Sequence, residues 1–130
     1  MSLHLTLSDS EVASVRVEAG DLWIRFSAAA TVWTGTAPDE KPVVGFSRGL
    51  VLRLQGAQIL ESQEPQFGRV AEGRVRLDAK ALRTLPVPLD HAGPTHLELA
   101  FANRANLVAT GKGLAVEFLG PTHFMESLAC

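Results

Sequence analysis

The segments LELAF (residues 97–101) and LAVEF (residues 114–118) determine the fold class of this chain of 130 residues. Apolar and polar residues alternate in both, and a period of two places every second side chain on the same face of a β-strand. One face of each strand is then buried and the other solvated, as in antiparallel sheets. The same alternation recurs at residues 22–26 and 50–54, so we predict strands along most of the chain.

Turn signals at short intervals predict a single all-β domain over residues 1–130, an antiparallel β-sandwich or partly open β-barrel of about eight or nine strands. We expect at most one short helical turn, over residues 79–84 behind a capping Asp78. A tight hairpin is predicted at residues 111–113. Gly120 and Pro121 are expected to end the sheet and leave a C-terminal tail at residues 121–130.

Two further expectations concern packing. The apolar run over residues 22–33 is long for one strand, so we predict a bulge or bend near its three consecutive alanines, residues 28–30. The inward positions of the strongest strands are expected to be almost fully buried. These positions are Leu52, Leu99, Phe101, Val116 and Phe118.

Composition narrows the functional classes. Hydrophobic residues make up 46% of the chain and charged residues 20%, which is typical of a soluble globular protein. The net charge of −2 gives no electrostatic reason to expect nucleic acid or an anionic membrane as a partner. Cys130 stands alone and the first residues lack a basic, apolar signal segment, so a cytoplasmic protein without disulfides is expected.

One motif suggests a hydrolase. Residues 45–49, GFSRG, fit the G-x-S-x-G pattern, which places a nucleophilic serine on a turn between a strand and a helix. Here the motif leads into the strand at residues 50–54, and no helix is predicted after it. We therefore expect that Ser47 is not a nucleophile and that the two glycines let the backbone turn into that strand.

Other candidate sites lack essential components. His96 and Glu98 share one strand face with His91 and Asp90 nearby, but the convergent ligand set of a metal site is missing. The basic residues between Arg69 and Arg83 have no aromatic residues among them, unlike platforms for single-stranded nucleic acid. We predict no catalytic, cofactor-binding or metal-binding residues and no enzyme activity.

Strand parity places Trp23 opposite the inward side chains of its strand, beside Arg25, with Val51 on the same outer face of another strand and Trp33 further along. Tryptophan and arginine are enriched at the centres of protein interfaces. These four residues form a candidate interface, with a homodimer or another protein as the expected partner. The alternative is that a second sheet or the C-terminal tail covers Trp23 within one chain.

The sequence therefore favours a non-catalytic protein-binding or assembly module. A β-barrel that binds a small molecule in its interior is the alternative. A hydrolase that uses the GFSRG serine is the third and least favoured class.

Overall fold

The computed structural model describes residues 2–35 and 39–126, and these residues contain nine strands and no helix. All strand pairs are antiparallel. The strands are β1 (Ser2–Glu18), β2 (Asp21–Thr34), β3 (Val43–Gln55), β4 (Gln58–Gln63), β5 (Gly68–Leu77), β6 (Lys80–Leu82), β7 (Thr84–Val87), β8 (Leu89–Phe101) and β9 (Asn106–Glu126).

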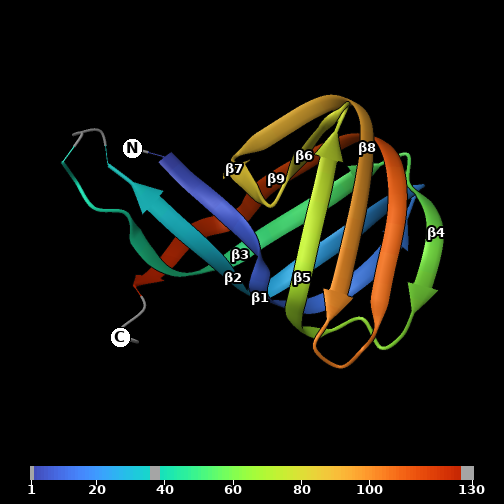
Figure 1. Cartoon of the computed structure of the whole chain (residues 1–130), viewed down its shortest axis with the longest axis horizontal. Coiled ribbons are helices and arrows are strands. Elements are labelled where there is room, and N and C mark those ends of the chain that lie inside the picture. Colours follow the sequence, from blue (N-terminus) through green and yellow to red (C-terminus); the bar gives the residue numbers. More distant parts are fainter. Residues whose placement is uncertain (1, 36–38, 127–130) are drawn as a thin grey trace.

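Six strands close into a barrel, in the order β1, β2, β3, β9, β8 and β5 (Figure 1). A short pairing of β1 with β5, Glu11 with Arg69 and Val12 with Gly68, completes the circle. Strands β4, β6 and β7 add to β9, β5 and β1 respectively. The predicted all-β fold is confirmed, and the barrel is closed rather than partly open.

The barrel interior is filled by apolar side chains from all six strands. Leu52, Leu99, Phe101 and Val116 are buried there, as their parity predicts. Phe118 is only partly buried and packs against this core. The reason is local: the pairing of β9 with β3 shifts register immediately beyond Phe118, so the strand is leaving the barrel at that point.

Four strands continue beyond the barrel into a smaller sheet, which we call the extension. It consists of residues 2–6, 29–34, 43–48 and 123–126, with β7 at its edge, and lies at the left of Figure 1 near both chain ends. Two of these strands change clearly at the boundary. β1 bulges between Thr6 and Glu11, and the burial alternation of β2 inverts between Phe26 and Ala29, which confirms the predicted bend near the alanines.

The Ser10 side chain makes hydrogen bonds to the backbone at this boundary. The buried Ser10 hydroxyl donates to the Thr6 carbonyl at 2.6 Å and accepts from the Ala30 amide at 2.8 Å. It thus replaces ladder hydrogen bonds that the bulge interrupts.

At the same boundary in β3, Gly49 has a φ of 81°, a conformation that glycine adopts without steric cost.

The predicted helical turn over residues 79–84 is wrong. Residues 80–82 form β6 and pair with residues 75–77 of β5. Asp78 takes a φ of 56° and its amide donates to the Pro94 carbonyl at 2.9 Å, so it makes a hairpin turn instead of a helix cap. Aspartate tolerates this left-handed conformation better than most residues, which allows the strand pairing to prevail.

The predicted hairpin at residues 111–113 is also wrong, because β9 runs through it without turning. Close packing explains these glycines. A Cβ at Gly111 would approach the Gln55 carbonyl oxygen at 2.7 Å, and one at Gly113 the His91 carbonyl oxygen at 2.9 Å. Nor does the sheet end at Gly120 and Pro121, since residues 123–126 pair with residues 45–48. The rest of the predicted tail lies outside the described residues.

Candidate functional site

Trp23 lies on the outer face of the barrel, in a hollow of about 240 Å³. Cross-strand pairing places Arg16 of β1 on one side of it and Arg53 of β3 on the other. Directly paired residues point to the same side of a sheet, so both arginines flank the indole. The Arg53 guanidinium carbon lies 4.9 Å from the centre of the Trp23 ring, within cation–π range.

Asp21 fixes this arrangement. Its Oδ2 accepts from Nε of Arg53 at 2.8 Å and lies 2.6 Å from Nη2, while its Oδ1 accepts from the Gly56 amide at 3.0 Å. The Gly56 amide and the Arg53 guanidinium hold the pKa of Asp21 below its ordinary value. The carboxylate thus stays charged near neutral pH and keeps Arg53 against the indole.

Val51 lines the same hollow and is only 3% exposed, although it points away from the barrel interior. Arg25 and Glu117 are its cross-strand neighbours, and both are exposed. Among the described residues, neither of these two charged groups makes a hydrogen bond or an ion pair. Leu119 adds an apolar side chain that is 54% exposed. The hollow therefore combines apolar surface with one charge, Arg25, that has no partner in the described part of the chain, and Glu117 lies beside the hollow on β9.

The structure brings together three of the four predicted interface residues, Trp23, Arg25 and Val51. Trp33 does not join them, because it lies in the extension at the far end of β2, beside Leu3 and Val43. Sequence reasoning missed Asp21, Arg53 and Arg16. The turn at Ala19 and Gly20 contains a signal for Arg16, since the register of the hairpin that it forms pairs Arg16 with Trp23.

The sequence also offered the C-terminal tail as a cover for Trp23. Residues 123–126 pair with residues 45–48 in the extension, whereas Trp23 pairs with Arg53 near the other end of β3. The described part of the tail is therefore not beside Trp23. The remainder, residues 127–130, lies outside the described residues.

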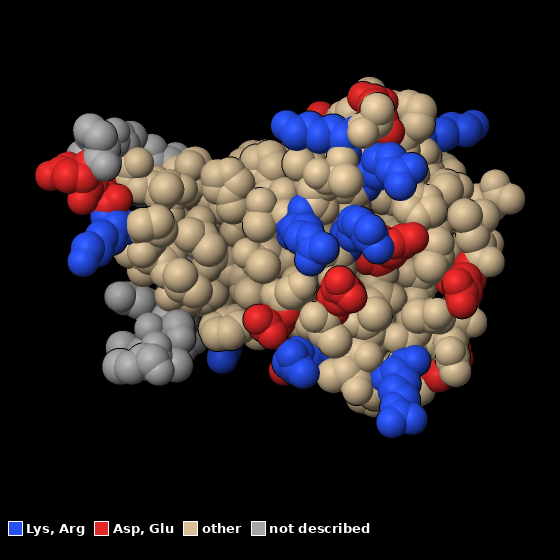
Figure 2. Space-filling model, in the orientation of Figure 1, with Lys and Arg blue, Asp and Glu red and all other residues tan. Residues whose placement is uncertain are grey.

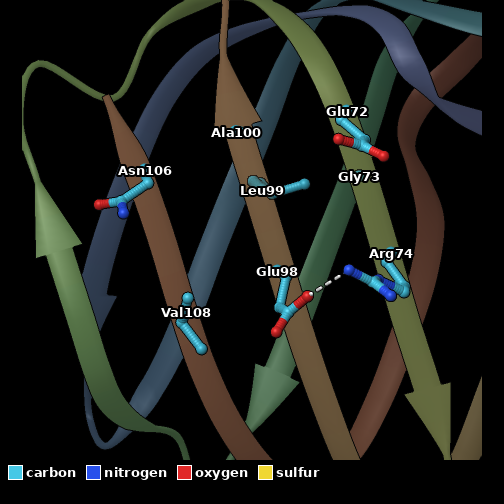
Figure 3. Close-up of a pocket in the computed structure, with 8 residues that line it drawn as sticks. All are labelled: Glu72, Gly73, Arg74, Glu98, Leu99, Ala100, Asn106 and Val108. Carbon is cyan, nitrogen blue, oxygen red and sulfur yellow. Dashed lines mark ion pairs between the residues drawn. The ribbon is translucent and has the colours of Figure 1, made fainter. Parts of the chain in front are cut away.

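A second hollow, of about 190 Å³, lies on the outer face of β5, β8 and β9 (Figure 3). Glu98 points toward Arg74 across the strands, with 3.2 Å between Oε2 and Nη2, and its other oxygen lies 3.2 Å from Nε2 of His96. The hydrogen bond to His96 and the charge of Arg74 hold the pKa of Glu98 below its ordinary value. The Glu98 carboxylate therefore already has two partners on the sheet surface.

Charges of both signs are mixed over the face that β5 and β8 cross (Figures 1 and 2). The described residues on this visible face form no extended patch of one sign. In the part of the chain that the structure describes, no three His, Cys, Asp or Glu side chains come close enough together to hold a metal ion. The described residues include no helix of the length and hydropathy needed to cross a membrane.

Ser47 of the GFSRG motif is fully buried in the extension. Its hydroxyl oxygen lies 2.8 Å from the hydroxyl oxygen of Thr31, which is also buried. β3 continues through Gly49 without a helix. A nucleophile elbow exposes its serine at a turn between a strand and a helix. Ser47 is neither exposed nor followed by a helix.

Comparison with known proteins adds no assignment, since no family model, curated protein or solved structure matches the chain.

Proposed function

We propose that this protein is a non-catalytic protein-binding or assembly module that binds its partner through the outer face around Trp23. The observation that supports this most is the fixed position of the Trp23 indole. It lies under the Arg53 guanidinium, and Asp21 contacts that guanidinium through two of its nitrogens. A pre-positioned tryptophan loses little side-chain freedom on binding, and tryptophan and arginine dominate the energetics of protein interfaces.

The filled barrel supports this class over an interior ligand site. Small-molecule sites are usually cavities of roughly 300–1,000 Å³ with a few convergent polar groups. The apolar side chains that form the barrel core are at most 5% exposed. A partner that binds the outer surface needs no interior space.

The position of Ser47 supports a non-catalytic role. A hydrolase needs its serine accessible to substrate, with a base within hydrogen-bond reach. The Ser47 hydroxyl is buried against the Thr31 hydroxyl instead.

Light scattering tests the proposal with a second copy of the chain as the partner, which is the homodimer that the sequence predicts. Wild-type protein at tens of micromolar is expected to show a mass above that of the 13.9 kDa chain, and Trp23→Lys is expected to lower it. Val44→Lys is the matched control, because Val44 is an exposed apolar residue of the extension, away from Trp23. A Trp23→Lys protein with unchanged mass, or a mass that falls only in Val44→Lys, would contradict the proposed surface.

A further inference from the structure

Two rows of paired residues cross the outer face of β2, β3 and β9. The first row is Arg25, Val51 and Glu117, and the second is Trp23, Arg53 and Ala115. Each row has β3 at its centre. Neighbouring strands are about 4.8 Å apart, so Arg25 and Glu117 flank Val51 at about equal distances. Their backbones are roughly 10 Å apart across the sheet.

The two sides of β3 are complementary to each other. In the first row an arginine lies opposite a glutamate, and neither has a charged partner among the described residues. In the second row the large indole of Trp23 lies opposite the methyl group of Ala115. A hollow of about 350 Å³ extends over Ala115, with Glu117, Asp90 and Pro88 among its lining residues. One side of β3 thus carries the indole of Trp23 and the cation of Arg25, and the other carries an open space over Ala115 and the anion of Glu117.

We propose that the partner is a second copy of this chain, bound face to face about a two-fold axis that runs parallel to β3. Such an axis lies in the plane of the interface and exchanges the two sides of β3. It brings Arg25 of each protomer opposite the partner's Glu117, and the indole of each protomer opposite the hollow over the partner's Ala115. This inference rests on the proposed function and specifies its partner and register.

The charge balance of the face favours a copy over a partner of one sign. The charged residues that line the two hollows are three basic and four acidic, so the face carries both signs. They are Arg16, Arg25, Arg53, Glu18, Asp21, Asp90 and Glu117. An acidic partner would meet Glu117 and Asp90, and a basic partner would meet Arg25. A face with both signs on opposite sides of one strand matches its own two-fold image. The two-fold axis also brings the Arg53 side chains of the two protomers opposite each other. This is compatible with the dimer, because Asp21 of the same chain neutralises each Arg53.

Charge reversal tests the register. Arg25→Glu alone sets two carboxylates against each other across the interface, and Glu117→Arg alone sets two guanidinium groups against each other. Like charges across an interface weaken it, so we expect each variant to dimerise at least tenfold more weakly than wild type by light scattering. Arg76→Glu changes the net charge as Arg25→Glu does, but on the exposed face of β5, so it is expected to leave the dimer intact.

Recombination of the variants gives the decisive result. A one-to-one mixture of Arg25→Glu and Glu117→Arg restores opposite charges across the interface, so it is expected to recover the dimer mass, as is the double variant. Circular dichroism checks that each protein is folded, which we expect because both positions are exposed.

Absence of recovery in the mixture would overturn the register, and a monomeric wild type would overturn the homodimer. If Trp23→Lys still abolishes association while the mixture does not recover, the two-fold register fails and the proposed function stands. A mass insensitive to Trp23→Lys contradicts both.

Discussion

Replacement of Leu99 by alanine should reveal how tightly the barrel interior is packed. Leu99 is 2% exposed and lies between Gly73 of β5 and Leu107 of β9. The substitution removes three carbons, which loses about 2.4 kcal/mol at about 0.8 kcal/mol per methylene. Hydrogen-bonded strands on both sides limit collapse, so a residual cavity adds about 1 kcal/mol more. We therefore expect a total loss of about 3–4 kcal/mol.

Urea unfolding at fixed protein concentration measures this loss, which should lower the midpoint without changing the slope m. Ala100→Ser is the control, because Ala100 is the next residue of β8 and is exposed; it should change the free energy of unfolding by less than about 0.5 kcal/mol. A loss below about 1 kcal/mol for Leu99→Ala would refute a packed interior at this position.

Three further predictions concern single residues. Because the pKa of Asp21 is lowered in the fold, its carboxylate stabilises the folded state above the ordinary pKa of 3.8. This stabilisation is lost as pH falls through the lowered pKa. In urea unfolding, the stability difference between Asp21→Asn and wild type should therefore be larger at pH 7 than at pH 3. Gly49→Ala should cost about 1–2 kcal/mol because φ is positive there, and an unchanged thermal midpoint would argue against that conformation. A fluorophosphonate probe should leave the protein unlabelled, whereas stoichiometric labelling that Ser47→Ala abolishes would show a reactive serine.

Strand parity predicted most of the core because the alternation is local. Leu52, Leu99 and Val116 need only their neighbours in sequence to be assigned to the interior. The errors arise where contacts with strands distant in sequence determine the local structure. Gly111 and Gly113 resemble a hairpin in sequence, but Gln55 and His91 pack so closely that only glycine fits.

The candidate site was predictable in part for the same reason. Parity identified Trp23 and Arg25 as outward, but the burial of Val51 depends on the long side chains around it. Trp33 was grouped with them on parity alone, but it lies at the far end of β2, in the extension. The ion pair between Asp21 and Arg53 depends on the register between β2 and β3. That register could not be predicted from the sequence, because the length of the loop between the two strands was uncertain.

The fluorescence of Trp23 itself reports whether another protein chain covers the face around it. The chain has two tryptophans, so Trp33→Phe leaves Trp23 as the only one. We predict that acrylamide quenches Trp23 weakly at tens of micromolar, and that quenching rises as dilution halves the mass seen by light scattering. Quenching that stays constant while the mass halves would show that the partner chain binds elsewhere and would contradict an interface at Trp23.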